Sequence, residues 1–366
     1  MQVKKPTILL NKERVMNNIK KMVEKAKKSQ VLFRPHFKTH QSADIGEWFK
    51  ELGVSAIAVS SVDMAEYFAE HGWKDITITF VLNIRQIDEI NKLAEKITLN
   101  LLVDSQEVVA FLKENIKSKV NIWIKTDTDY HRTGIHWDNE PLLSTVIRDI
   151  KNSENLNFVG LLTYSGKTYK SKSKINIEDI YEDTILKLIN IQERLFLQGF
   201  AHVKISVGDT PSCSIIDDFT GVDEIRPGNF VFYDVMQLSL GSCKEEDIAI
   251  AVACPIVAKY LEKKTVVIYG GAIHLSKDYL EKEDGTKYYG LVALQEGKAW
   301  GKTLKSTFVA SVSQEHGLIS TTEDILEKLE IGDLLYILPI HSCLTSNLLR
   351  KYITLEGNEI NFNTKI

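Results

Sequence analysis

The segment Val31-Leu32-Phe33-Arg34-Pro35-His36-Phe37-Lys38-Thr39-His40 decides the fold assignment, because a short apolar run passes directly into a dense polar cluster. Two histidines, an arginine and a lysine lie within seven residues, Arg34 to His40. The apolar run is typical of a buried strand, and polar clusters that follow parallel strands are typical of the active-site end of a β/α barrel. The residues alone also allow a basic turn at the surface.

The pattern around this segment repeats along the first two thirds of the chain, where short apolar runs alternate with stretches of helical spacing. In residues 11–28, for example, Val15, Ile19 and Val23 form an apolar stripe between lysines. This alternation predicts parallel β/α architecture, and about eight strand candidates favour a (β/α)₈ TIM-type barrel. No GxGxxG motif follows an early strand, which disfavours a Rossmann fold. The strand candidates are Thr7–Leu10, Val31–Phe33, Ala56–Val59, Ile76–Phe80, Leu99–Val103, Val120–Lys125, Phe158–Thr163 and Val203–Val207.

The pattern changes after about Phe232. Apolar runs such as Ile248–Val257, Thr265–Tyr269 and Leu334–Leu338 are separated by turn-rich stretches and have no long helical partners. Short strands joined by turns predict an antiparallel β domain. We therefore expect a barrel over residues 1–240 and a C-terminal antiparallel β domain over residues 241–366.

Composition excludes several classes of protein. The 366 residues are 44% hydrophobic and 26% charged with a net charge of −4, so we expect neither disorder nor a nucleic-acid-binding or anionic-membrane surface. The four cysteines form no CxxC pair, which disfavours a disulfide scaffold. Residues 1–6 are polar and no run reaches the roughly 18 apolar residues of a membrane span, so we expect a cytoplasmic protein.

Polar loops that follow several strand candidates predict one shared site. In the segment Arg34–His40, repulsion between neighbouring cations should lower the pKa of Lys38, which suits an amine nucleophile. The loops Lys125–Gly134 and Thr163–Gly166 follow other strands, although the first could serve only as a turn. Ser206–Ser212 and Arg226–Asn229 offer glycine, hydroxyl groups and backbone donors, as a phosphate cradle requires. Together the loops indicate a phosphate-bearing cofactor.

A second candidate site lies in the segment Leu338–Thr345. His341 and Cys343 are two residues apart, so on an extended segment their side chains would point the same way. An imidazole and a thiolate can bind a metal, and the sulfur favours zinc over magnesium or manganese. Two protein ligands leave coordination positions open for substrate. The alternative is a half-buried cysteine beside an ordinary histidine.

Taken together, these motifs resemble the D-threonine aldolase and D-serine dehydratase family, the metal-assisted branch of the alanine-racemase-like pyridoxal 5′-phosphate (PLP) enzymes. The resemblance runs from Pro6-Thr7 through nearly the whole chain. Its specific elements are Arg34–His40 and His341-Ser342-Cys343; Arg132-Thr133-Gly134 and the glycine-containing loops are less specific. It implies a (β/α)₈ barrel joined to a β domain, in a homodimer with active sites near the subunit interface.

The resemblance also implies roles for individual residues. Lys38 resembles the catalytic lysine that binds PLP covalently, and Arg132 resembles an arginine near the cofactor ring. His341 and Cys343 resemble the ligands of a divalent metal. Relatives often carry glycine where this chain has Asp129, which bears on the backbone shape near Arg132. The remaining positions expected around the cofactor and its phosphate are Tyr164, Thr210, Gly228 and Asn229.

The implied substrate is a small D-β-hydroxy amino acid. Cys343 resembles the dehydratase branch, in which D-serine gives pyruvate and ammonia, whereas aldolases of the family more often have aspartate there. Retro-aldol cleavage to glycine and an aldehyde remains the alternative within the family. An amino-acid racemase and a non-catalytic PLP-binding protein are the alternatives from other classes.

Overall fold

The computed structural model describes residues 3–365, which divide into two compact units. The barrel unit comprises residues 20–228 and 363–365, and the sheet unit comprises residues 3–19 and 229–362. This division differs from the expected ranges of 1–240 and 241–366 at the N-terminus and near residue 229. The first boundary falls inside helix α1 (Lys12–Lys28).

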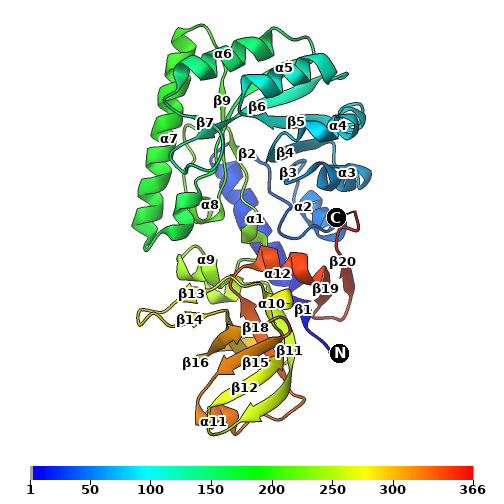
Figure 1. Cartoon of the computed structure of the whole chain (residues 1–366), viewed down its shortest axis with the longest axis vertical. Coiled ribbons are helices and arrows are strands. Elements are labelled where there is room, and N and C mark those ends of the chain that lie inside the picture. Colours follow the sequence, from blue (N-terminus) through cyan, green and yellow to red (C-terminus); the bar gives the residue numbers. More distant parts are fainter. Residues whose placement is uncertain (1–2, 366) are drawn as a thin grey trace. The chain divides into compact units, whose positions relative to one another are not determined.

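The barrel unit is built on eight parallel strands (Figure 1). Their order in the sheet is β2-β10-β9-β8-β6-β5-β4-β3. Seven of the eight coincide with sequence candidates. The strands are β2 (Leu32–Phe33), β3 (Ala56–Val59), β4 (Asp75–Val81), β5 (Thr98–Val103), β6 (Val120–Asp127), β8 (Leu156–Leu162), β9 (Lys204–Val207) and β10 (Glu224–Ile225). The short β7 (Ile135–His136) pairs with the end of β6.

The segment Arg34–His36 brings the two ends of this sheet together. His36 forms an isolated parallel bridge with Ala58 of β3. The Phe37 N–H donates to the Ala58 carbonyl at 2.9 Å, and the Ala58 N–H donates to the Pro35 carbonyl at 3.0 Å. The chain that leaves β2 therefore continues the ladder to β3, so the fold is the expected (β/α)₈ barrel.

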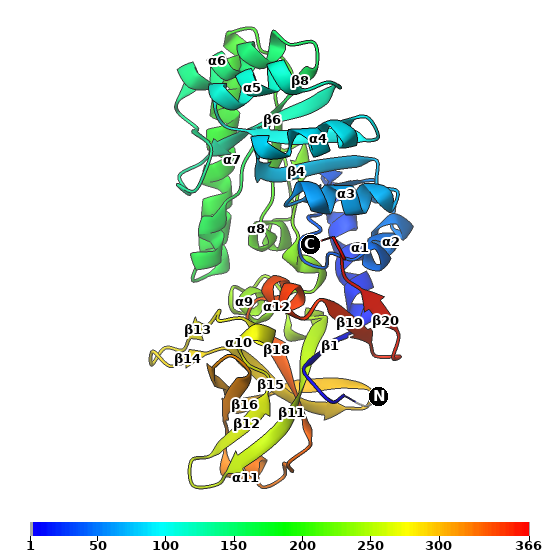
Figure 2. The ribbon, with the colours of Figure 1, turned by 45° about the vertical axis from the view of Figure 1, so that its right-hand side comes forward.

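Helices lie around the outside of the strands, as Figures 1 and 2 show for α3 to α7. Serine side chains cap several of them: Ser61, Ser105 and Ser173 each accept a hydrogen bond from a backbone N–H of the first turn. The helices are α2 (Ala43–Glu51), α3 (Val62–Glu70), α4 (Ile87–Ala94), α5 (Gln106–Asn115), α6 (Glu140–Lys151), α7 (Lys174–Leu197) and α8 (Thr210–Ile215). No helix within residues 3–365 is long and apolar enough to cross a membrane.

The sheet unit contains a mostly antiparallel nine-stranded sheet in the order β12-β17-β16-β15-β18-β11-β1-β19-β20. Its short helices are α9 (Val235–Ser239), α10 (Ala272–Leu275), α11 (Glu323–Leu326) and α12 (Ser342–Leu349). A separate hairpin pairs β13 (Leu280–Glu281) with β14 (Lys287–Tyr288). The sheet strands are β1 (Thr7–Leu10), β11 (Ile250–Tyr260), β12 (Thr265–Tyr269), β15 (Gly290–Glu296), β16 (Ala299–Val312), β17 (His316–Ser320), β18 (Leu334–Pro339), β19 (Lys351–Thr354) and β20 (Glu359–Asn361).

Strand β1 corrects the sequence interpretation, which made Thr7–Leu10 a barrel strand. It pairs antiparallel with β11 and parallel with β19, so it belongs to the sheet unit. The eighth barrel strand is instead β10, whose residues Glu224 and Ile225 lie between Asp223 and Arg226 and form no apolar run. The parallel pairing of β1 with β19 makes the otherwise antiparallel sheet mixed. Parallel pairing is possible here because a long stretch of chain connects the two strands.

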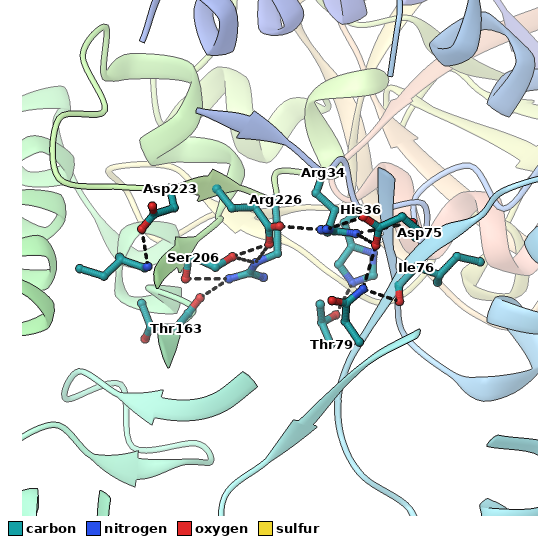
Figure 3. A network of polar contacts seen from close by, with 12 residues as sticks. Arg34, His36, Asp75, Ile76, Thr79, Thr163, Ser206, Asp223 and Arg226 are labelled. Carbon is teal, nitrogen blue, oxygen red and sulfur yellow. Dashed lines mark hydrogen bonds and ion pairs between the residues drawn. The ribbon is translucent and has the colours of Figure 1, made fainter. Parts of the chain in front are cut away.

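A buried belt of polar side chains crosses the interior of the barrel (Figure 3). Arg34 donates to Glu224 at 2.6 Å and to both oxygens of Asp75 at 2.7 and 3.2 Å. Ser206 donates to the other oxygen of Glu224 at 2.7 Å and accepts from Arg226 at 2.7 Å. Burial disfavours the charged form of Arg34, but the two carboxylates outweigh it and raise the pKa of the guanidinium. The belt thus joins β2, β4, β9 and β10 from within.

Replacing Arg34 with Met should destabilise the protein strongly, because Glu224 would remain buried without its main cation. Loss of one member of a buried charge network typically costs about 3–5 kcal/mol. Urea unfolding followed by circular dichroism measures the free energy of unfolding. The matched control is Arg194→Met, which removes an arginine that lies 3.8 Å from Glu140 and is 40% exposed; a change of at most about 1 kcal/mol is expected there. Equal losses in the two variants would contradict this role of Arg34.

Candidate functional site

Lys38 lies in a turn directly after the bridge that closes the barrel. The neighbouring Phe37 is fully buried, and its ring centroid lies 4.9 Å from those of Phe49 and Phe68 and 5.0 Å from that of Trp73. The Gln41 N–H donates to the Phe37 carbonyl at 3.0 Å and closes the turn. Lys38 itself is exposed. The aromatic anchor therefore fixes the backbone of the turn while the lysine side chain stays accessible.

His36 holds the same turn by hydrogen bonds from both ring nitrogens. Nδ1 accepts from the Lys38 backbone N–H at 3.2 Å, and Nε2 lies 2.9 Å from the Thr79 hydroxyl. The Thr79 hydroxyl donates to the Val59 carbonyl at 3.1 Å, so Nε2 is the protonated nitrogen. Burial, with the nearby charges of Lys38 and Arg226, lowers the pKa of His36 well below its usual value. The imidazole is therefore neutral at physiological pH.

The loops after β9 and β10 form a close-packed cradle. A Cβ added to Gly208 would lie 2.7 Å from the backbone of Arg226, and one added to Gly228 would lie 2.8 Å from the His36 carbonyl. Thr210 begins helix α8, and its Oγ1 is buried without a hydrogen-bond partner. A side chain at either glycine would clash with these neighbours, so glycine is what allows the loops to pack this closely. The unsatisfied hydroxyl indicates a missing hydrogen-bonding group here.

Arg132 and Tyr164 meet at the neighbouring edge of the barrel. The Arg132 guanidinium carbon lies 4.7 Å from the centroid of the Tyr164 ring and 5.4 Å from that of Tyr130, within cation–π range. Burial, helped by the charge of Asp209, raises the pKa of Tyr164, so its phenol stays protonated. Since Tyr164 follows β8 and Asp209 follows β9, the arrangement spans two adjacent strand ends.

Asp129 retains the backbone shape that a glycine would give. Its φ of 70° lies in the left-handed region that glycine adopts easily and that aspartate tolerates better than most residues. The carboxylate accepts from Lys187 at 2.5 Å and lies 2.8 Å from His136 Nε2. The hydrogen bond from Lys187 is the main cause that lowers the pKa of Asp129 to about 2. These partners hold the loop before Arg132 in a backbone conformation that glycine would adopt without such contacts.

The sequence did not predict that Lys125 and Arg226 are buried in the barrel. Lys125 on β6 is buried and its pKa falls to about 7, mainly by burial and then by the charges of Arg226 and Arg132. Arg226 was expected only to help close the phosphate cradle, yet its guanidinium also donates to the Thr163 carbonyl at 2.6 Å inside the barrel. Both residues lie in loops or strands that the sequence singled out. The sequence did not predict that these two cations lie near one another, because that depends on the order of the strands in the barrel.

The metal candidates His341 and Cys343 lie at the start of α12 in the sheet unit. The expected extended segment is wrong: His341 is the N-cap, and the helix begins at Ser342. Although burial opposes the charged imidazole, Asp278 and Cys343 together raise the pKa of His341. Asp278 accepts from His341 Nδ1 at 2.9 Å, which leaves Nε2 available as a metal ligand. Cys343 is buried, and residues 3–365 contain no cluster of three or more acidic, histidine or cysteine side chains placed to hold a metal.

The predicted cofactor residues therefore divide between the units. Lys38, Arg132, Tyr164, Thr210 and Gly228 lie at or after the carboxyl ends of the barrel strands, where active sites of such barrels form. Asn229 belongs to the sheet unit, and its side chain contacts the start of α12 rather than the cradle.

Comparisons with known proteins agree with this architecture. By fold, the chain is an alanine-racemase-like barrel protein: it matches the structure of D-threo-3-hydroxyaspartate dehydratase from Delftia sp. HT23 with a TM-score of 0.89 and 26% identity over 99% of this chain and 98% of that one. The chain belongs to the alanine racemase N-terminal domain family, whose model matches residues 10–235. Residues 249–355 match the serine dehydratase domain family.

Curated relatives span nearly the whole chain. D-threo-3-hydroxyaspartate dehydratase from Delftia sp. (strain HT23) is 28% identical over 93% of this chain and 91% of its own length. D-serine dehydratase from Dictyostelium discoideum is 29% identical over 95% of this chain and 92% of its own length. The structure of a cysteine-to-alanine mutant of D-threo-3-hydroxyaspartate dehydratase in the metal-free form matches with a TM-score of 0.90 and 26% identity over 99% of this chain and 98% of that one.

The burial of Lys125 predicts a measurable pH dependence of stability. Because its pKa is about 7 in the folded protein and 10.5 when unfolded, the unfolded chain binds more protons between these values, and stability rises with pH across that window. Lys125→Met should flatten this rise by about 2 kcal/mol between pH 7 and pH 9. Urea unfolding of both proteins at pH 7, 8 and 9 checks it. Parallel stability profiles for the two proteins would show that folding does not lower the pKa of Lys125.

Proposed function

We propose that this chain is a PLP- and metal-dependent lyase that removes water from a small D-β-hydroxy amino acid, as in the conversion of D-serine to pyruvate and ammonia. The observation that carries the proposal is the pairing of the His341 imidazole, oriented by Asp278, with the buried Cys343 thiol in the sheet unit. In the barrel unit, the anchored turn that presents Lys38 supports it independently. Two relatives whose sequences align with more than nine tenths of this chain are named dehydratases. This supports a lyase over a carrier protein.

The residues of the barrel unit fit PLP. The buried Thr210 hydroxyl lacks a partner that a phosphate oxygen would supply. Gly208 and Gly228 allow the loops after β9 and β10 to pack tightly against Arg226 and His36 in the same region. Tyr164 and Arg132 would line the cofactor beside it. When bound, PLP supplies an electron sink for charge that develops at the α-carbon of an amino acid.

Lys38 would hold the cofactor covalently through Nζ and then act as a base. Its exposed side chain can reach a ligand, while Phe37 and His36 keep its backbone fixed. A free amine at Nζ can take the α-proton of the substrate, which is the first proton transfer that dehydration needs. His36, neutral and donating to Thr79, holds its own proton and so leaves that role to Lys38.

The donor set at α12 fits a zinc ion. The imidazole of His341 and the thiolate of Cys343 are ligand types that zinc prefers, and Asp278 orients the imidazole. A bound metal would act as a Lewis acid on the hydroxyl group that leaves. Two solved structures are of D-threo-3-hydroxyaspartate dehydratase mutants, one with a histidine and one with a cysteine replaced by alanine, at positions two residues apart. The structure of the cysteine mutant is of the metal-free form. The spacing is that of His341 and Cys343.

We also propose that the enzyme works in the cytoplasm as a homodimer. A reducing compartment keeps thiols reduced, and none of the four cysteines forms a disulfide. Expectations of no nucleic-acid partner and no membrane partner follow from composition and belong to the same proposal.

Replacing Lys38 with Ala should abolish covalent attachment of PLP. We expect the visible absorption band of the wild-type protein, which borohydride should bleach, to be lost in the variant. Lys167→Ala, which removes another lysine of the barrel unit outside the cradle, should keep the band and its bleaching. An unchanged spectrum in Lys38→Ala would contradict the assignment of the cofactor lysine.

Product analysis tests the reaction itself. D-serine, D-threonine and D-3-hydroxyaspartate should each be tested as substrates, and a keto acid with ammonia is expected. Glycine with an aldehyde would instead show aldol cleavage, and the L-isomer would show racemisation. Cys343→Ala should lose bound zinc and at least about a hundredfold in dehydration rate, whereas retained activity without metal would favour the racemase alternative.

A further inference from the structure

The side-chain amide of Asn229 lies beside Cys343, one of the two metal candidates. Its Nδ2 lies 2.6 Å from Asp234 Oδ2, 3.1 Å from Ser342 Oγ and 3.7 Å from Cys343 Sγ. All of these residues belong to the sheet unit, and Asn229 is buried. The amide therefore sits where it can donate to both side chains that follow His341.

Asp234 fixes which end of this amide faces the thiol. Its carboxylate is fully buried and also accepts from the backbone N–H groups of Gln237 and Ser342, each at 2.9 Å. Because a carboxylate accepts hydrogen bonds and does not donate them, the Asn229 group that faces Asp234 is the NH₂. One of its two hydrogens is taken by Asp234. The second is left to Ser342 Oγ and Cys343 Sγ.

We infer that Asn229 is a positioning residue for the Cys343 thiolate, to which it donates an N–H···S hydrogen bond when a metal is bound. The inference rests on the proposed function only in taking Cys343 as a metal ligand. A thiolate is a stronger hydrogen-bond acceptor than a neutral hydroxyl, so deprotonation of the sulfur draws the shared hydrogen towards it. Asp234 acts through Asn229 and through Ser342, whose N–H it holds at the start of α12.

This arrangement would give each ligand its own outer partner. Asp278 holds His341 through Nδ1, and Asn229 holds Cys343 through its sulfur. Outer partners orient metal ligands, and their loss typically costs about 10–100-fold in metal affinity. A donor to sulfur also withdraws electron density from the thiolate, so it raises the energy needed to move charge from sulfur to metal.

The test uses the PLP-loaded protein with cobalt(II) as a spectroscopic probe and zinc for affinity. The thiolate-to-cobalt band is read as a difference spectrum between cobalt-loaded and metal-free protein, and zinc affinity is measured by competition with a chelator. In Asn229→Ala, zinc affinity should fall about tenfold and the band should move to lower energy. Ser342→Ala removes the competing oxygen, so its band should move to higher energy. Cys254→Ala, a buried truncation in the same unit, should change neither quantity.

The variant Cys343→Ala separates this inference from the proposed function. If wild-type protein shows no band that Cys343→Ala removes, Cys343 is not a ligand and the metal assignment fails with the inference. If that band is present but Asn229→Ala and Ser342→Ala leave it unmoved, the hydrogen bond to sulfur is overturned while the metal assignment stands. Opposite shifts in the two variants support the inference. If Asn229→Ala folds poorly, Ser342→Ala carries the test: a band at higher energy supports the hydrogen bond to sulfur, and an unmoved band overturns it.

Discussion

The burial of the Arg34 guanidinium is the constraint on which the barrel depends. A buried cation is tolerated only with carboxylates and further hydrogen bonds around it, and Glu224 of β10 and Asp75 of β4 supply them. The same short segment continues to His36, whose bridge to Ala58 closes the ring, and to Lys38. Closure of the fold and placement of Lys38 are thus achieved by residues of one short segment.

Much of the fold could be predicted because its signals are local. Short apolar runs revealed seven barrel strands, and turn-rich spacing revealed the second unit. Strand β10 was missed because Glu224 and Ile225 lie between Asp223 and Arg226 and form no apolar run. Strand β1 was misassigned because its apolar run gives no information about its partner, and those partners, β11 and β19, lie far along the chain.

The candidate site could be predicted by residue type more readily than by contact. Lys38, His341 and Cys343 stood out by chemistry and spacing. What could not be predicted was which atoms meet. The side chain of Asn229 adjoins a phosphate-loop sequence but contacts Cys343, and Lys125 lies near Arg226 and Arg132, which come from the loops after β10 and β6. The backbone at Asp129 could not be predicted either. Its left-handed conformation is accompanied by an ion pair with Lys187, which the identity of the residue does not indicate.

The pairing of β1 has a consequence for synthesis of the chain. Thr7–Leu10 leaves the ribosome first, yet its partners are residues 250–253 and 352–354. At about 5–20 residues per second, the strand waits on the order of ten to fifty seconds for β11 and longer for β19. Every strand of the barrel unit is made within that interval. The N-terminal strand is therefore an exposed edge during translation, and a chaperone that covers it would act on the nascent chain before any other part of the sheet exists.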